Sequence, residues 1–111
     1  KKMIAIHKKY KILSRGSLKF LWNDYQGLCY GRFSHTEHMI VILNNRDEAR
    51  EVMIELWPAG ISRLEDTPLL MLLQSEQNGY SEEQKLVIAR AGAIRLLLPQ
   101  RSVTLLYHKD Q

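Results

Sequence analysis

The run Met39–Leu43 carries an apolar side chain at every position, and it limits the possible folds more than any other stretch. Successive side chains of a β-strand point to opposite faces, so a strand of this kind is buried on both faces. Such a strand is typical of the middle of a sheet that has packed layers on either side. The apolar run Leu28–Phe33 precedes it, and the polar segment Ser34–His38 joins the two. This arrangement predicts a central hairpin.

The chain after residue 16 follows the two-residue period of strands almost throughout. Val52, Ile54 and Leu56 alternate with Glu51 and Glu55, which favours a strand with one buried and one solvated face. The expected strands are 17–22, 28–33, 39–45, 50–57, 69–73, 84–90, 93–98 and 102–108. Since turn-forming residues separate these runs, we expect an all-β fold, an eight-stranded antiparallel β-sandwich, with no helix after residue 13.

Two details of this pattern are open to a direct structural check. Leu18, Phe20 and Trp22 stand two residues apart, so they are expected on one face of their strand. The dipeptide Ala91-Gly92 is a turn signal, and it predicts a hairpin between the strands on its two sides.

Residues 2–13 instead follow the period of an α-helix. Met3, Ile6 and Tyr10 form an apolar stripe with lysines around the rest, and Gly16 is suited to the helix C-terminal cap. We therefore expect an amphipathic helix within residues 1–15 and a β-sandwich domain over residues 16–111. Because the chain opens inside this helical pattern, it is expected to be a fragment of a longer protein.

The positive charge of the chain is concentrated in this segment. The net charge is +4, and residues 1–15 hold six of the sixteen Lys and Arg residues and no acidic residue. The β part is slightly acidic, so the lysines are interpreted as the solvated face of a helix and no nucleic-acid partner is expected. No apolar run reaches the roughly 20 residues that a membrane span needs, and no secretory signal is present. A cytoplasmic location without a membrane partner is therefore expected.

Few residues are arranged for chemistry. His35 and His38 have a metal-like spacing, but no third ligand lies near them in sequence and a zinc site needs three or four. Both are expected to be solvated residues of a turn. Cys29 lies within an apolar strand and is expected to be a buried, unreactive thiol. We therefore expect no catalytic residue, metal or other cofactor in this chain.

Glycoside hydrolysis requires two carboxylates that face each other across a cleft, about 5 to 9 Å apart. The acidic pairs Asp47-Glu48, Glu65-Asp66 and Glu82-Glu83 are sequence neighbours. Neighbours along a strand point to opposite faces, so these pairs are expected to be a solvated rim.

Aromatic side chains gather at the expected strand ends and turns. The residues are Trp22, Tyr25, Trp57 and Tyr80. Aromatic residues at such places most often cap the core or fill a domain interface. As an alternative, their exposed rings could stack on a sugar.

Several stretches resemble one family. The segment from Ile4 to Leu21 resembles the junction in the α-amylase superfamily between the last helix of the catalytic (β/α)8 barrel and the C-terminal β domain. Tyr30–Phe33, Val41–Asn45 and Leu56–Ile61 are similar to that domain in neopullulanases, cyclomaltodextrinases and maltogenic amylases. The closing Leu98–Ser102 looks like the last turn of the domain, although its Gln and Arg depart from the usual Pro-aromatic pair.

The resemblance implies Greek-key connections and a catalytic barrel of the same parent chain as partner. The parent would hydrolyse α-1,4 and α-1,6 glucosidic bonds with an Asp nucleophile and a Glu acid/base. Those residues lie upstream of Lys1 in the family, so none is assigned here. The leading hypothesis is a non-catalytic accessory domain that stabilises the barrel, and the alternative is a carbohydrate-binding module for α-glucan. The first hypothesis predicts that Met3, Ile6, Tyr10 and part of a sheet face meet the barrel. The isolated chain should then expose an apolar patch and self-associate.

Overall fold

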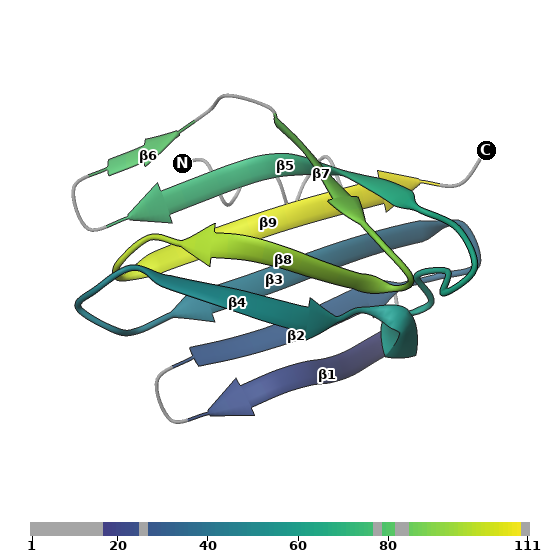
Figure 1. The fold of residues 1–111 in the computed structure, drawn as a ribbon, viewed down its shortest axis with the longest axis horizontal. Helices are drawn as coiled ribbons and strands as arrows, with labels where there is room; N and C mark the ends of the chain where they lie inside the picture. The colour runs from purple at the N-terminus through teal and green to yellow at the C-terminus, as the bar shows by residue number, and fades with distance from the viewer. Residues whose placement is uncertain (1–16, 25–26, 77–78, 82–84, 110–111) are drawn as a thin grey trace.

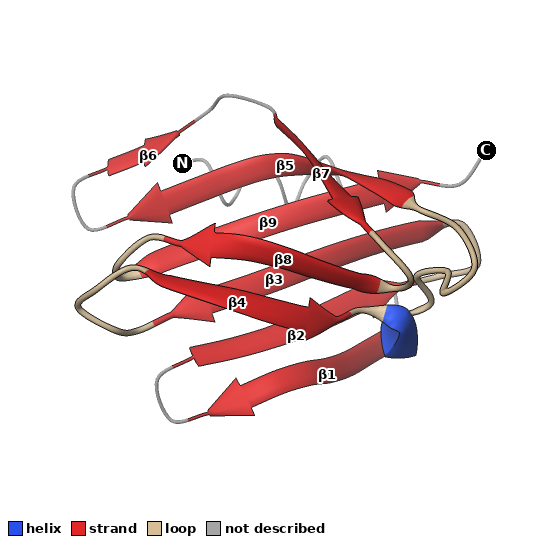
Figure 2. Ribbon diagram, viewed as in Figure 1, coloured by secondary structure: helices blue, strands red, loops and turns tan. Residues whose placement is uncertain are grey.

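The computed structural model describes residues 17–24, 27–76, 79–81 and 85–109. These ranges contain strands throughout and no α-helix (Figures 1 and 2), which confirms the all-β class. The strands are β1 (Ser17–Asp24), β2 (Gly27–Phe33), β3 (Glu37–Asn44), β4 (Arg50–Glu55), β5 (Thr67–Glu76), β6 (Gly79–Ser81), β7 (Lys85–Ala89), β8 (Ala93–Leu98) and β9 (Ser102–Lys109). The described residues form nine strands where eight were expected, because the short β6 pairs with the end of β5.

The predicted helix and the proposed boundary after residue 15 lie outside the described residues. Within those residues, no helix has the length and apolar character that a membrane crossing requires.

The strands form two layers that lie face to face (Figure 1). One layer is a seven-stranded sheet in the order β1-β2-β3-β9-β5-β6, with β7 also paired to β5. The other layer is the antiparallel pair β4 and β8. All pairings are antiparallel, which agrees with the expected sandwich. The Greek-key description of the connections stays a prediction.

β3 lies in the interior of the large sheet, between β2 and β9, and the prediction that it is buried on both faces is confirmed. Ile40 and Ile42 point into the core between the two layers, where they meet Val52, Ile54 and Ile94 of the small layer. Met39 and Val41 point to the opposite face and join a second cluster with Leu72, Leu73 and Leu105. The large sheet therefore has an apolar inner face and an apolar outer face.

The prediction that Leu18, Phe20 and Trp22 share one face of β1 is wrong. Phe20 pairs with Tyr30 and Trp22 pairs with Cys29, so Leu21 is an extra residue in a β-bulge. A bulge shifts the alternation of faces by one residue. Phe20 consequently packs against Tyr30 on the outer face, whereas Trp22 packs against the inner core.

The predicted hairpin across Ala91-Gly92 is also wrong in its pairing. β7 pairs with β5 of the large sheet and β8 pairs with β4 of the small one, so the two strands belong to different layers. A single bridge between Arg90 and Ala93 is the extent of their direct pairing. Ala91 and Gly92 both have positive φ angles, +53° and +80°, and the tight turn carries the chain from one layer to the other.

The strand expected over 50–57 ends at Glu55, because the chain turns into one turn of 3₁₀ helix, η1 (Trp57–Ala59). Pro58 near its start favours this conformation over a continuing strand. Gly60 follows at a φ of +91° and donates its backbone N–H to the Trp57 carbonyl oxygen at 3.0 Å. The prediction that no helix follows residue 13 therefore holds for α-helices in the described residues, and this turn of 3₁₀ helix is an exception to it.

Candidate functional site

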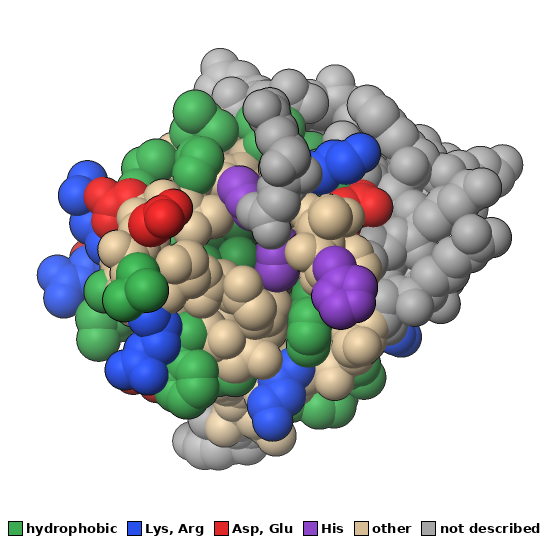
Figure 3. Space-filling model, turned by 90° about the vertical axis from the view of Figure 1, so that its right-hand side faces the viewer, with side chains coloured by type: hydrophobic (Ala, Val, Ile, Leu, Met, Phe, Trp, Pro, Cys, Tyr) green, Lys and Arg blue, Asp and Glu red, His purple; other side chains and the backbone are tan. Residues whose placement is uncertain are grey.

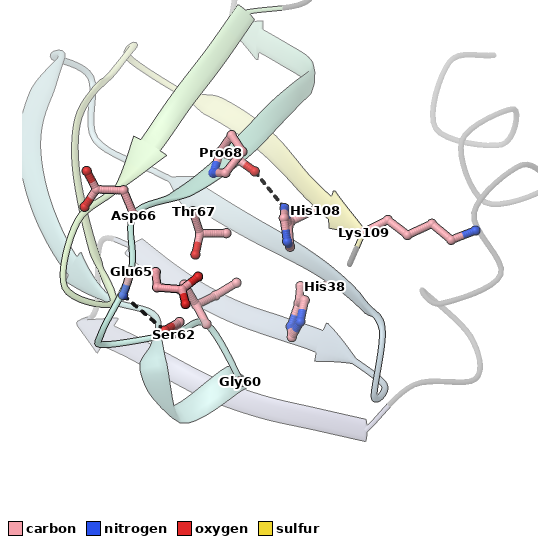
Figure 4. Close-up of a pocket in the computed structure, with 10 residues that line it drawn as sticks. His38, Gly60, Ser62, Glu65, Asp66, Thr67, Pro68, His108 and Lys109 are labelled. Atoms are coloured by element: carbon pink, nitrogen blue, oxygen red, sulfur yellow. Dashed lines mark hydrogen bonds between the residues drawn. The ribbon is translucent and has the colours of Figure 1, made fainter. Parts of the chain in front are cut away.

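A hollow of the described structure lies at one end of the sandwich. It has a volume of about 510 Å³, and the loop between η1 and β5 forms one wall while the ends of β3 and β9 form the other. Figure 3 faces this end of the molecule and shows histidine side chains around the hollow. The lining residues are His38, Gly60, Ile61, Ser62, Glu65, Asp66, Thr67, Pro68, His108 and Lys109 (Figure 4).

Two imidazole rings lie on the wall that β3 and β9 form. His38 and His108 are directly opposite each other on β3 and β9, with ring centroids 5.9 Å apart. A carbonyl oxygen can only accept, so Nδ1–H of His38 donates to Ala59 O at 3.0 Å and Nδ1–H of His108 donates to Pro68 O at 2.8 Å. The backbone thereby fixes the orientation of both rings.

His35 and His38, which are close in the sequence, lie in different environments in the structure. His35 is exposed in the turn, as expected, but His38 is only 4% exposed and belongs to β3. The prediction that His38 is a solvated turn residue is therefore wrong. Within the described residues no group of three or more potential ligands is placed to hold a metal ion.

The acidic residues of the cavity do not form a hydrolytic pair. Glu65 and Asp66 are both exposed, and Figure 4 shows the Asp66 carboxylate turned away from the cavity. Asp66 lies 3.5 Å from a guanidinium nitrogen of Arg90 instead. At the other end of the sandwich, Asp47 is 2.7 Å from Arg101 Nε, so it too is an exposed ion-pair partner. Glu82 and Glu83 lie outside the described residues.

The described tryptophans do not form a shared sugar platform. Trp22 is half-buried, with the guanidinium carbon of Arg50 4.8 Å from its ring centroid. Trp57 is 41% exposed, with Arg63 at the same distance over its ring. Trp22 lies towards the end of β1, whereas η1 with Trp57 lies beside its start (Figure 1). Tyr25 and the side chain of Tyr80 lie outside the described part.

Cys29 is fully buried in the inner core, and burial raises the pKa of its thiol to about 12. The thiolate is the reactive form of cysteine, so this residue has no nucleophilic role in the native fold. The prediction of a buried thiol is confirmed.

Two exposed apolar surfaces remain. The first, called the β1 patch, consists of Leu18 and Phe20, which are 45% and 60% exposed, together with the half-buried Tyr30. It continues the outer apolar face of the large sheet to its edge. The second, called the small-layer patch, lies on the opposite side of the molecule. Its apolar members are Met53 of β4 and Leu97 of β8.

The chain matches no protein-family model and no curated protein. Solved structures do match it. An α-amylase of Geobacillus thermoleovorans, crystallised with acarbose, aligns with 99% of the chain at a TM-score of 0.75 and 14% identity. A debranching enzyme of Nostoc punctiforme aligns with 95% at a TM-score of 0.66 and 19% identity. A GH30 endoxylanase of Clostridium papyrosolvens aligns with 97% at a TM-score of 0.69 and 12% identity.

These likenesses show the fold. The chain spans 22% of the α-amylase, 18% of the debranching enzyme and 27% of the endoxylanase. In each of these structures the matching domain is thus one part of a much longer glycosidase chain. The fold that the resemblance of Tyr30–Phe33 and Leu56–Ile61 implies is the fold that these neighbours share.

Sequence reasoning missed His108, Thr67 and the loop residues that complete the cavity. His38 and His108 are 70 positions apart, and the register of β3 against β9 brings them together. The one usable sequence signal was the placement of both histidines beside apolar strand residues.

Proposed function

We propose that this chain is a non-catalytic C-terminal accessory domain of an α-glucan-hydrolysing glycosidase, where it packs against the catalytic barrel and stabilises it. The fold likeness supports this, because it covers nearly the whole chain but only about a fifth of the α-amylase. A parent similar to neopullulanase or cyclomaltodextrinase, with residues 1–15 as the last barrel helix, is the finer form of the proposal.

The observation that carries the proposal is the apolar edge of the outer face of the seven-stranded sheet. The middle of this face, with Met39, Val41 and Leu105, is almost fully buried, whereas its edge at β1 is exposed. Sheets with an apolar face pack it against another layer of secondary structure. At the β1 edge of the face, Phe20 is 60% exposed. We infer that the barrel packs on this side and covers the β1 patch.

The test uses the full-length parent enzyme that the upstream sequence is expected to encode. Phe20→Glu places a charge in the β1 patch, where burial of a large apolar side chain is worth about 2 kcal/mol. The expected result is a lower melting temperature of the barrel and easier proteolysis between the two domains. Leu64→Glu is the matched control, because Leu64 is 96% exposed and lies in the loop away from the patch. A barrel with unchanged melting temperature in Phe20→Glu contradicts the proposal.

The alternative, α-glucan binding, is favoured by the exposure of Trp57. Titration of the chain with maltoheptaose, followed by tryptophan fluorescence, separates the two functions. An accessory domain without a sugar site gives a flat titration at millimolar sugar. A saturable change that Trp57→Ala removes would instead support the binding module.

A further inference from the structure

The cavity at the end of the sandwich is bordered by a hydroxyl group that the fold itself does not use. Thr67, the first residue of β5, lines the cavity and is only 7% exposed. Its side chain makes no hydrogen bond within the described residues, and Figure 4 shows its hydroxyl pointing into the cavity. A hydroxyl in such a place is satisfied only by water or by a ligand inside the cavity.

Two further groups, both from the loop between η1 and β5, line the same space. Ser62 Oγ accepts the backbone N–H groups of Leu64 and Glu65, at 3.1 and 3.2 Å. Both bonds use this oxygen as acceptor, so the hydroxyl proton of Ser62 remains available for donation. Figure 4 shows the Glu65 side chain extending into the cavity, and its carboxylate makes no ion pair within the described part of the chain. The cavity therefore offers two hydroxyl groups and one carboxylate with open hydrogen-bonding capacity.

The charges around the cavity limit the class of ligand that it suits. The Glu65 carboxylate repels an anion. Because this carboxylate is exposed to solvent and Lys109 also lines the cavity, its attraction for a cation is weak. Asp66 adds little, since it is paired with Arg90 at 3.5 Å. The site therefore suits a neutral ligand better than a charged one.

The size and the polarity of the cavity narrow the choice further. Its volume of about 510 Å³ lies within the range of about 300–1,000 Å³ that is typical of small-molecule sites. A neutral ligand that pairs with hydroxyl groups and a carboxylate needs groups that both donate and accept, and a hydroxyl does both at one atom. We propose that the cavity binds a neutral polyhydroxyl ligand of the size of a sugar ring, held by Ser62, Glu65 and Thr67.

This site is distinct from the other surfaces of the molecule. Trp57 does not line the cavity, so the ligand does not depend on the aromatic stacking of the alternative function. The β1 patch also contributes no lining residue. The inference goes beyond the proposed function and does not rest on it.

An NMR titration of the isotope-labelled chain with glucose, galactose and mannose tests the proposal. At least one of these neutral hexoses should shift the amide signals of Ser62, Glu65 and Thr67 in a saturable way, with a dissociation constant in the millimolar range. If none of the three sugars gives saturable shifts at these residues at about 100 mM, the proposal is overturned.

Thr67→Val is the matched variant, because valine keeps the shape of threonine and lacks the hydroxyl. The loss of one hydrogen bond to the ligand should weaken binding about two- to tenfold. Thr67→Ser keeps the hydroxyl and should retain most of the affinity. Thr36→Val is the control, since Thr36 is exposed in the turn before β3 and does not line the cavity. A Thr67→Val chain that binds as tightly as the wild type contradicts the proposal.

Two charged hexoses test the class of ligand. Glucuronate carries a carboxylate and glucosamine carries an ammonium group on nearly the same ring. Repulsion by Glu65 should make glucuronate bind more weakly than the best neutral hexose, and Glu65→Gln should remove this difference. Glu48→Gln, at the other end of the sandwich, is the control and should preserve it. A preference of tenfold or more for either charged sugar overturns the assignment of a neutral ligand.

Discussion

At the scale of single residues, burial decides the chemistry of Cys29. Its side chain is 0% exposed and its pKa is raised to about 12, so almost no thiolate exists at about pH 8, where a free cysteine is partly ionised. We predict that the native chain does not react with a chromogenic disulfide reagent at that pH. One thiol per chain should react rapidly after unfolding in guanidinium. Fast modification of the native chain would show that β2 opens readily.

The ion pair between Asp47 and Arg101 has a consequence for acid stability. The hydrogen bond from Arg101, and then its charge, hold the pKa of Asp47 below its ordinary value. A carboxyl with a lowered folded-state pKa contributes stability above its ordinary pKa. That contribution is lost as the pH falls through the lowered folded value.

We predict that Asp47→Asn flattens the fall of the melting temperature between about pH 5 and pH 2. Near neutral pH the change should be small, since both side chains are exposed and solvent screens the pair. Thermal unfolding followed by circular dichroism over this pH range measures both effects. Parallel pH profiles of the variant and the wild type would contradict the assignment.

At the scale of elements, the end of η1 depends on a glycine that touches the cavity. Gly60 has a φ of +91°, and a Cβ atom there would lie 2.8 Å from Cε1 of His38. Both the backbone conformation and the close approach exclude a side chain. We predict that Gly60→Ala lowers the free energy of unfolding by about 1–3 kcal/mol. Chemical denaturation measures it.

Ala91 supplies the matched control for this prediction. It is exposed and has a φ of +53°, a conformation that glycine adopts without strain. Ala91→Gly should therefore leave stability unchanged or raise it slightly. Equal losses in the two variants would mean that backbone flexibility, and not the contact with His38, governs the Gly60 position.

The position of most strands was predictable from the sequence, because burial on one or two faces leaves a direct trace in the pattern. Val52, Ile54 and Leu56 are buried and Glu51 and Glu55 are exposed, as their alternation predicts. The bulge in β1 left no such trace. Phe20 and Trp22 stay two residues apart whether or not Leu21 is paired, so the partner strand alone decides which face each occupies.

The pairing of strands was less predictable than their position. Ala91-Gly92 does form a tight turn, but the edge of β5 over Thr67–Met71 binds β7 in the place of β8. The cavity has the same origin, because Pro68 O and Ala59 O orient histidines that lie 40 and 21 positions away. Such non-local contacts depend on the register of the sheet, which a periodic pattern does not specify.

At the scale of the whole molecule, the sandwich has two apolar surfaces, one on the outer side of each layer. The outer face of the large sheet is a continuous cluster, and its β1 edge is exposed. On the small-layer patch, Met53 and Leu97 stand beside Glu51 and Arg95, which form an ion pair at 3.9 Å within the chain. The outer face of the large sheet is therefore the surface better suited to packing on another apolar layer.

If the proposed barrel packs at the β1 edge of the outer sheet face, only one of these two surfaces should affect it, since the core of the sandwich lies between Phe20 and Met53. We predict that Phe20→Glu lowers the melting temperature of the barrel in the full-length parent and that Met53→Glu leaves it unchanged. Differential scanning calorimetry of the two variants and the wild type measures the effect. An equal loss in both variants would show that the fall comes from destabilisation of the sandwich itself, and not from a broken contact with the barrel, because Met53 lies on the side of the sandwich that the barrel does not reach.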